Sequence, residues 1–473
     1  MLTKSDFLRF LACPNEFWLN ARFPEVEKEL TLQDKQIREQ GYEVERLART
    51  LSIFKDRDGF AVEFGKQFIT ENLYAKSDAV VTNLADGVID IYEVKQAASA
   101  KPEHMDDLAF QKHIAELTGF NVGKVFLITV NTKYVLTGAM DVEQLLNVSD
   151  HTDQVAAKKD DVAEKIILAW ALLETEADPG ATLTDLCKAK KLDCRFLRRH
   201  FSEIPDYNVS HIFNYGTKKL TSLLTLGIVS INDIPAEFKL TDIESRLVQV
   251  ARTGEPHINI DEIRKEILAQ EYPLHFLDYE GYYPAVPKFE NTRPYQQMVF
   301  QYSLHTVAAP GEEPGHCFHL SRNDGKHPAE EIAERLYEDL AHRPGTIVVW
   351  NESYEKKRNE EMAELFPRYS EFFLDLNERV FDLRKIFSKH HYLHPDFHGG
   401  DSIKKVLPVL FPDDPSYKDL GIGVGTDAAT LWYHMASGRV KGTEGQKVYD
   451  DLCEYCELDT RAMVKIFNFL SVI

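Results

Sequence analysis

The chain is poor in cysteine, in long apolar runs and in positive charge. Six cysteines in 473 residues are too few for the disulfide framework of a secreted domain, and no apolar run approaches the roughly 18–20 residues of a membrane span. Residues 1–6 lack a signal-peptide pattern, so we expect a cytoplasmic protein without a membrane partner. Lysine and arginine number 55 against 76 acidic residues, which argues against wrapping nucleic acid on a broad basic face.

What the chain does contain is enough apolar sequence for several cores. It is 44% hydrophobic and 28% charged, and its length suggests two to three domains. Strand and helix patterns alternate over much of the sequence, which predicts an α/β protein. We expect a first domain at 1–204, a helical connector at 205–268 and a third domain at 269–473. Within these we predict a polar loop at 146–161 and one continuous helix at 209–226.

A short stretch at 275–280 (His-Phe-Leu-Asp-Tyr-Glu) has the pattern of a buried strand that carries two acids. Residues i and i+2 of a strand face the same side, so Asp278 and Glu280 aim two negative charges at one spot. Such a buried pair is costly unless a cation neutralises it, and Mg²⁺ or Mn²⁺ prefers carboxylate oxygens. The stretch predicts a metal site; the alternative is that one acid faces solvent at the strand end.

A second set of polar residues lies in the first third of the chain. Asp78 is on one predicted strand, and Glu93 and Lys95 share a face at the end of the next. Two carboxylates can hold Mg²⁺, while a lysine can orient a water or stabilise charge on a scissile phosphate. Gln111 on the following helix would position substrate, and Glu43 on the first long helix would add an acid. The alternative is an exposed hairpin with ordinary charges.

This ordered set resembles the RecB-like branch of the PD-(D/E)xK nucleases, which includes the CRISPR-adaptation exonucleases. The resemblance rests on residues 5–19 with Cys-Pro-Asn-Glu-Phe-Trp, on Asp78, on Glu-Val-Lys at 93–95 and on Ala-Phe-Gln at 109–111. It implies a restriction-endonuclease-like core in which the Asp, Glu and Lys bind metal and activate water. In that family a histidine often fills the helical position that Glu43 occupies in this chain.

Relatives of that family often carry a four-cysteine iron–sulfur cluster, with one cysteine before the nuclease core and three after it. In this chain Cys13 precedes the core, Cys187 and Cys194 follow it, and His200 stands roughly where a fourth cysteine is expected. Thiolates favour an iron–sulfur cluster or zinc, and imidazole suits zinc. The resemblance therefore implies an iron–sulfur or zinc cofactor, and the alternative is that these cysteines are buried or idle.

Two further motifs follow the strand at 275–280. Tyr354 and Glu355 come just after a predicted buried strand at 345–350, and Tyr455 and Asp459 lie four residues apart on one face of the last predicted helix. The alternative for the last pair alone is an exposed helix pair. In this order the motifs resemble those of the proofreading-type 3′–5′ exonucleases, in the tyrosine-bearing version of the DEDD set on a ribonuclease H-like fold.

That resemblance implies two divalent ions about 4 Å apart, held by four carboxylates, with a tyrosine that orients the attacking water. The carboxylates would be those of Asp278, Glu280, Glu355 and Asp459, and the tyrosine would be Tyr455. The usual acid at the third position is Asp rather than Glu, and Asp382 is a reserve candidate.

End to end, the chain resembles an uncharacterised bacterial family that fuses these two nuclease-like halves. Arg293, Tyr295, Gln297, Lys404 and Lys405 lie in shared segments and would contact a nucleic-acid strand or serve the structure. We expect a Mg²⁺- or Mn²⁺-dependent nuclease that acts on DNA ends or single strands, with DNA repair or phage defence suggested by analogy of fold. The alternatives are a nucleic-acid-binding scaffold with one or both centres decayed, and an RNA exonuclease.

Overall fold

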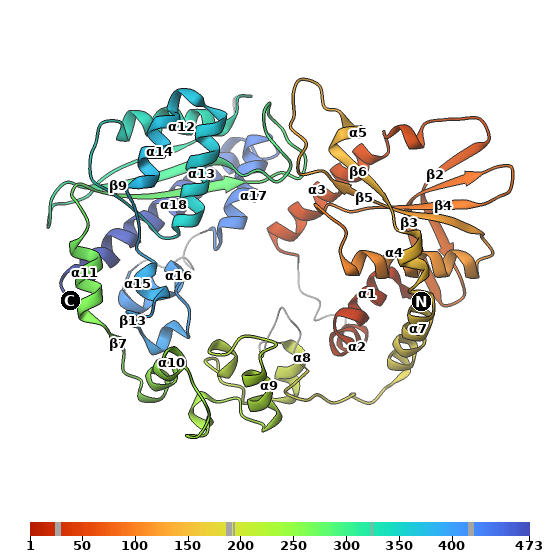
Figure 1. The fold of residues 1–473 in the computed structure, drawn as a ribbon, viewed down its shortest axis with the longest axis horizontal. Coiled ribbons are helices and arrows are strands. Elements are labelled where there is room, and N and C mark those ends of the chain that lie inside the picture. Colours follow the sequence, from red (N-terminus) through yellow and green to blue (C-terminus); the bar gives the residue numbers. More distant parts are fainter. Residues whose placement is uncertain (24–29, 186–191, 193, 323–324, 415–420) are drawn as a thin grey trace. The chain divides into compact units, whose positions relative to one another are not determined.

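The computed structural model describes residues 1–23, 30–185, 192, 194–322, 325–414 and 421–473. The chain has mixed sheets and many helices, which confirms the predicted α/β class (Figure 1). It divides into two compact units. Unit 1 comprises Met1–Glu203 and Pro284–Gln296, and unit 2 comprises Ile204–Tyr283 and Gln297–Ile473. The segment Pro284–Gln296 thus packs with unit 1, although it lies inside the range predicted for the third domain.

Unit 1 is built on a sheet in the order β1-β3-β4-β5-β6, with β2 paired to β3. β4 and β5 are parallel, whereas β3 and β4 form an antiparallel pair. The strands are β1 (Leu2–Thr3), β2 (Phe60–Ile69), β3 (Leu73–Asn83), β4 (Ile89–Val94), β5 (Val122–Val130) and β6 (Leu146–Asp150). The predicted loop at 146–161 is wrong, because β6 pairs with β5 as a largely exposed edge strand.

The helices of unit 1 cover this sheet. They are α1 (Lys4–Ala12), α2 (Pro14–Arg22), α3 (Leu32–Ala48), η2 (Ser52–Phe54), α4 (Pro102–Leu117), α5 (Val142–Leu145), α6 (Thr152–Ala156), α7 (Lys159–Glu174) and α8 (Arg195–His200). α1 and α4 pack on one another and on β3, and Phe7 and Phe110 stack between them at 4.7 Å. α4 also buries the polar residues Asp107 and Gln111, so its inner face carries functional groups as well as core.

Unit 2 is built on a sheet in the order β10-β9-β8-β11-β12. β8 is antiparallel to β9 and parallel to β11. The strands of unit 2 are β7 (His257–Ile258), β8 (Leu274–Tyr282), β9 (Met298–Val307), β10 (Gly315–Leu320), β11 (Thr346–Val349), β12 (Val380–Asp382) and β13 (Tyr392–Leu393). β7 and β13 form a separate two-stranded pair.

Unit 2 also contains helices along its whole length. They are η3 (Val209–His211), α9 (Lys218–Thr225), η4 (Ile231–Asp233), α10 (Asp242–Thr253), α11 (Ile260–Leu268), α12 (Pro328–Leu340), α13 (Glu352–Leu365), η5 (Pro367–Tyr369), α14 (Ser370–Glu378), α15 (Lys385–Ser388), η6 (Pro395–Phe397), α16 (Ile403–Leu410), α17 (Gly425–Ala436) and α18 (Gly442–Ser471). The single helix predicted at 209–226 is wrong, because Gly216 adopts φ 79° and Thr217 caps a new helix.

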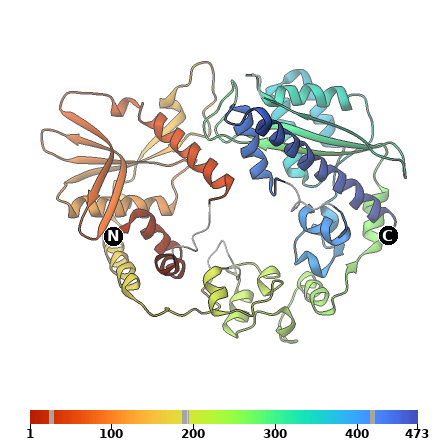
Figure 2. The ribbon, with the colours of Figure 1, turned by 180° about the vertical axis from the view of Figure 1, so that it is seen from behind.

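The long helix α18 packs on β8 and β9, and Figure 2 shows it from behind. Its apolar positions recur every three or four residues, as an amphipathic helix on a sheet requires. Leu452, Cys456, Met463 and Phe467 are among its buried residues, and Phe467 meets Phe276 of β8 edge to face at 5.8 Å. The same buried face carries Tyr455 and Asp459 toward the sheet.

None of the helices in the described part of the chain combines the length and the apolar composition needed to cross a bilayer.

Candidate active site

The strand β8 presents two acidic side chains on one face of the unit 2 sheet. It lies between β9 and β11, and most of its residues are buried. Asp278 and Glu280 point to the side covered by α18, whereas Tyr279 between them donates a 2.8 Å hydrogen bond to Asn359. The register with β9 shifts directly after Glu280, so the regular pairing is interrupted beside the acids. The period-two spacing thus places both carboxylates together, as the sequence predicts.

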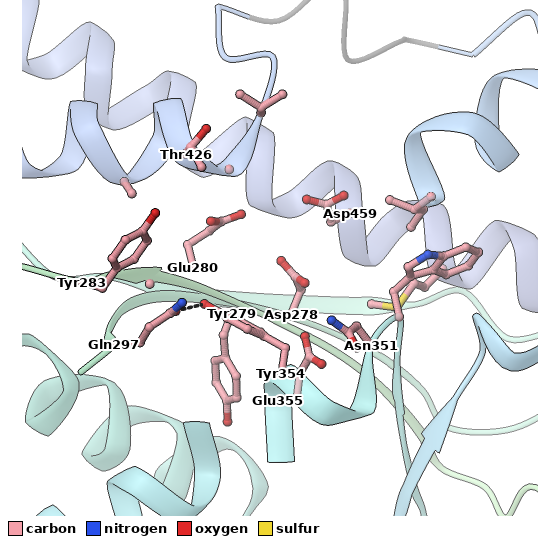
Figure 3. A pocket seen from close by; sticks show the side chains of 17 residues that line it. Asp278, Tyr279, Glu280, Tyr283, Gln297, Asn351, Tyr354, Glu355, Thr426 and Asp459 are labelled. Atoms are coloured by element: carbon pink, nitrogen blue, oxygen red, sulfur yellow. Dashed lines mark hydrogen bonds between the residues drawn. The ribbon is translucent and has the colours of Figure 1, made fainter. Parts of the chain in front are cut away.

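Helix α18 brings a third carboxylate to the same place. Carboxylate oxygens of Asp278, Glu280 and Asp459 lie within 4.8 Å of one another, although Asp459 is remote from the other two in the sequence. In Figure 3 Asp459 descends from α18 opposite Asp278. This spacing is within the reach of one divalent cation or a close pair of them.

Glu355 supplies a fourth acid from the first turns of α13. Its side chain is 3% exposed, and its Oε2 atom is buried without a hydrogen-bond partner in the structure. In Figure 3 its carboxylate lies just below that of Asp278. A buried carboxylate oxygen without a donor is costly, so this atom is positioned for a cation or a bound ligand.

Burial and neighbouring acids raise the pKa values of Asp278, Glu280 and Glu355. Burial raises the pKa of Asp278 well above its ordinary range, and the charge of Asp459 adds to this. Burial and then Asp278 likewise raise the pKa values of Glu280 and Glu355 well above theirs. Lys404 opposes the effect at Asp278 and Glu280 with a single positive charge. The pocket therefore holds more negative charge than it compensates, and a divalent cation would relieve this.

Tyr455 lies one helical turn before Asp459 and reaches the same cluster. Lys404 of α16 donates a 2.8 Å hydrogen bond to its phenolic oxygen and lies 4.8 Å from its ring centroid. Burial, Glu280 and Asp459 raise the pKa of Tyr455 above its ordinary range, so it stays a neutral phenol at neutral pH. Sequence reasoning assigned Lys404 to a nucleic-acid strand or to the structure, and missed its contact with the tyrosine.

The four acidic side chains line a pocket of about 400 Å³. It has aromatic walls at Tyr283 and Trp350, and the N-terminus of α17 contributes Gly425 and Thr426. Val424, at the N-cap of α17, makes no side-chain cap hydrogen bond. An uncapped helix N-terminus beside a pocket is suited to an anionic group such as phosphate. Gln297 also lines it and accepts a 2.8 Å hydrogen bond from Tyr354.

Asp382, the reserve candidate for a metal ligand, forms hydrogen bonds with backbone amides instead. Its carboxylate oxygens accept hydrogen bonds from the amides of Glu352 and Arg384, at 3.3 and 3.1 Å. Asp382 thereby ties the start of α13, which carries Glu355, to the end of β12. Its charge also raises the pKa of Glu355, after the larger effects of burial and Asp278.

Unit 1 contains the second set of predicted site residues, Asp78, Glu93, Lys95 and Gln111. Lys95 donates 2.6 Å hydrogen bonds to Glu93 and Asp107, and Gln111 donates to the same two carboxylates at 2.8 and 2.7 Å. The carboxylate of Asp78 accepts a 2.8 Å bond from the Val94 amide. Burial, with the neighbouring Glu93 charge, raises the pKa of Asp78 to about 7. The predicted Asp, Glu, Lys and Gln therefore belong to one buried network.

Lys4 and Asp107 belong to this network and were missed from the sequence. Lys4 of α1 donates a 2.7 Å hydrogen bond to Glu93 and lies 3.4 Å from Asp107. Burial disfavours ionisation of Glu93, yet Lys95 and Lys4 together lower its pKa to about 2. Two lysines thus pair with two of the three carboxylates of this network, Glu93 and Asp107.

Glu43 is not among the groups that the structure brings to Asp78. Its carboxylate pairs with Lys288 instead. Glu45, two residues further along α3, is the acid of that helix whose charge acts on Asp78. Glu45 also forms a 2.6 Å ion pair with Arg49. Sequence reasoning placed an acid on the correct helix but at the wrong position along it.

The candidate cysteine cluster is described only in part. Cys187 lies outside the described residues, Cys194 is buried, and Cys13 caps α2 by accepting a 3.4 Å bond from the Glu16 amide. Both ring nitrogens of His200 are engaged, with the Phe196 carbonyl at 3.0 Å and Asp178 at 2.6 Å. Among the described residues no metal-competent group contains Cys13, Cys194 or His200.

Comparisons with known proteins cover parts of the chain. Residues 275–402 match a family described as "Domain of unknown function (DUF2779)". The chain is similar to the uncharacterized protein UU173 of Ureaplasma parvum, 25% identical over 217 residues, which are 41% of this chain and 31% of that protein. It is also similar to the uncharacterized protein MG366 of Mycoplasma genitalium, 27% identical over 215 residues, which are 41% of this chain and 32% of that protein. The matched part thus spans about a third of the length of these relatives.

Proposed function

We propose that unit 2 is a divalent-metal-dependent nuclease that hydrolyses phosphodiester bonds of DNA at ends or in single strands. The observation that carries the proposal is the convergence of Asp278, Glu280 and Asp459 within 4.8 Å, with Glu355 beside Asp278. Acids from three separate elements meet in one pocket, where Lys404 opposes the charge of Asp278 and Glu280 and Arg358 opposes that of Glu355. Such an arrangement is costly for the fold alone, which favours a functional explanation.

The donor set fits Mg²⁺ or Mn²⁺. These ions prefer carboxylate oxygens, and the pocket offers four carboxylates, one of which has a buried oxygen without a hydrogen-bond donor. Asp278, Glu280, Glu355 and Asp459 would hold the metal. When bound, it would supply Lewis-acid stabilisation of phosphoryl oxygens and a water of lowered pKa.

The chain's own residues would orient the reacting groups. The phenolic oxygen of Tyr455 accepts its hydrogen bond from Lys404, so its own O–H can donate to an attacking water or a phosphoryl oxygen when substrate is bound. Lys404 also donates a 2.9 Å bond to the Gly423 carbonyl, which fixes it between Tyr455 and the approach to α17. The N-terminus of α17 would hold a phosphate that follows or precedes the scissile bond.

The pocket dimensions favour a strand end over an intact duplex. A volume of about 400 Å³ is within the range of small-molecule pockets and accommodates about one nucleotide. Tyr283 and Trp350 offer aromatic surface on which a base would stack, without preference for sequence. We therefore propose exonucleolytic release of mononucleotides, with DNA as the substrate and RNA as the alternative.

Unit 1 carries a second candidate centre with different electrostatics. Glu93 and Asp107 are already paired with Lys4 and Lys95. A divalent ion would have to displace Lys4 from these carboxylates before it could bind them. We therefore assign the main hydrolytic activity to unit 2 and a weaker, second nuclease centre to unit 1.

The test is an assay of the purified full chain on end-labelled single-stranded and double-stranded DNA and RNA, with Mg²⁺ or Mn²⁺. We expect release of mononucleotides from single-stranded DNA that stops on chelation. Asp459→Asn should reduce the rate by at least roughly 100-fold, whereas Lys95→Ala should leave most of it. Asp450→Asn, at an acid elsewhere on α18, is the matched control. Binding of the strand without any release would support the scaffold hypothesis instead.

A further inference from the structure

A second group of metal-ligating side chains lies on unit 2, apart from the four acids. His305 of β9 and His316 of β10 are direct partners in the antiparallel ladder. Their rings stack with centroids 4.3 Å apart. Glu457 of α18 faces them, and ligand atoms of all three residues lie within 4.8 Å of one another. Two imidazoles and a carboxylate therefore converge from three elements of the fold.

Buried hydroxyl groups hold both rings in place. Thr460 Oγ1 lies 2.8 Å from Nδ1 of His305, and Ser303 Oγ lies 3.0 Å from Nε2 of His316. The two hydroxyls are 2.7 Å apart, so they join the rings in one hydrogen-bonded chain. The remaining ring nitrogens are Nε2 of His305 and Nδ1 of His316, and these are the atoms that would bind a metal. Nδ1 of His316 lies 4.0 Å from Glu457 Oε2. Metal-binding histidines are commonly oriented in this way by a partner on the opposite ring nitrogen.

The site is open to solvent on one side. His305 is 4% exposed, whereas the side chains of His316 and Glu457 remain 21% and 40% exposed. An ion can therefore enter from solvent and reach the buried ring.

We propose that His305, His316 and Glu457 bind a divalent transition-metal ion, for which Zn²⁺ is the best match. Two imidazole nitrogens, one carboxylate oxygen and a water complete the tetrahedral set that Zn²⁺ prefers. Mg²⁺ is disfavoured at this site because it prefers oxygen ligands, which the acidic pocket supplies instead. The inference does not depend on the proposed nuclease activity, because it rests on a separate set of side chains.

An ion bound by His305, His316 and Glu457 would stabilise the packing of α18 on the sheet. Glu457 lies on α18 between Tyr455 and Asp459, and Asp459 lines the acidic pocket. An ion shared by Glu457 and the two histidines would tie α18 to β9 and β10 at this point. It would thereby fix the helix that presents Tyr455 and Asp459 to β8. Arg461 lies 3.8 Å from the other oxygen of Glu457.

The test is a titration of the chelator-treated full chain with Zn²⁺, followed by calorimetry, and with Co²⁺, followed by its visible absorption. The wild type should bind with a Co²⁺ spectrum typical of nitrogen and oxygen ligands in tetrahedral geometry. His316→Ala and Glu457→Gln should each weaken Zn²⁺ binding by at least the roughly 10- to 100-fold that follows loss of a supporting partner. Thr460→Val should weaken it about tenfold, because the His305 ring loses its orientation.

Two controls separate this site from the rest of the chain. His319→Ala removes a histidine of the same strand that pairs with Glu331 at 2.9 Å, and it should leave Zn²⁺ binding unchanged. Asp459→Asn should retain the Co²⁺ spectrum, because the acidic pocket is not its source. Glu457→Gln keeps the size of a half-exposed side chain, so its fold is expected to survive, as circular dichroism would show. Zn²⁺ binding by folded Glu457→Gln and His316→Ala with wild-type affinity would overturn the proposal.

Discussion

Lys404 Nζ donates a hydrogen bond of 2.8 Å to the phenolic oxygen of Tyr455, across two helices of unit 2. The bond joins α16 to α18 beside the acidic cluster. Two residues that lie on different elements thus act as one unit.

Removal of either partner should therefore slow hydrolysis without abolishing metal binding. We expect Tyr455→Phe and Lys404→Met each to lower kcat about 100-fold, a typical contribution of a positioned proton donor. The double variant should be little worse than either single one, because the two residues share one role. Single-turnover rates on a labelled DNA strand measure this. Additive losses would show that Lys404 contacts the substrate independently.

The repulsion among the buried acids predicts a gain of stability on losing one of them. Burial and Asp459 raise the pKa of Asp278, so its ionised form destabilises the metal-free fold at neutral pH. Asp278→Asn should raise the free energy of unfolding, because the neutral amide carries no charge that the fold must bury beside Asp459. Urea unfolding in the presence of a chelator measures it, with Asp450→Asn as the control. A loss of stability would mean that the carboxylate is already compensated.

Asp78 gives unit 1 a defined pH dependence. Its pKa rises from 3.8 in the unfolded chain to about 7 in the fold. Between these values the folded state binds more protons, so stability falls as pH rises through this window and levels off above it. Asp78→Asn should flatten that fall, as unfolding curves at a series of pH values would show. Because Asp78 must be ionised to coordinate metal, metal binding by unit 1 should also weaken below about pH 7.

Lys4 should act as a built-in competitor for metal in unit 1. Its ammonium is bonded to Glu93 at 2.7 Å, so Lys4→Met would leave Glu93 and Asp107 with Lys95 alone. We expect a lower melting temperature without metal and a larger rise in melting temperature when Mn²⁺ is added. Lys158→Met, which breaks an ion pair with Asp106 on the same helix as Asp107, is the control. An unchanged response to Mn²⁺ would remove Lys4 from this role.

Gly281 leaves room for the hydrogen-bonded pair of Tyr354 and Gln297, which lines the pocket. A Cβ at this position would lie 2.7 Å from the Tyr354 hydroxyl and 2.8 Å from Gln297 Oε1. Gly281→Ala should separate these groups, open their hydrogen bond and raise KM for the strand more than it lowers kcat. Gly315→Ala, at a strand glycine with only a backbone oxygen at 4.0 Å, should be silent in the same assay.

Sequence periodicity could predict those parts of the site whose residues lie within a few positions of one another in the sequence. The i, i+2 spacing of Asp278 and Glu280 and the i, i+4 spacing of Tyr455 and Asp459 fix shared faces without knowledge of the fold. The structure brings these faces together. The α/β class follows from the same patterns, and the buried strand at 275–280 forms as expected.

The remainder depends on tertiary contacts that leave no periodic signal. Lys4 meets Glu93 across 89 positions in the sequence, and nothing in either segment indicates the other. Glu45 and Glu43 lie on one helix, and only packing decides which of them turns toward Asp78. The edge strand at 146–150 is short and mostly exposed, so its sequence is also typical of a loop.

Binding of Mn²⁺ to the acidic pocket tests the central claim most directly. Paramagnetic resonance of free Mn²⁺ counts the ions bound to the full chain, and Asp278→Asn and Asp459→Asn are compared with Asp450→Asn. We expect each pocket variant to lose at least one bound ion that the control retains. Wild-type stoichiometry and affinity in both pocket variants would contradict the account, because the converging acids would then not form the cation site.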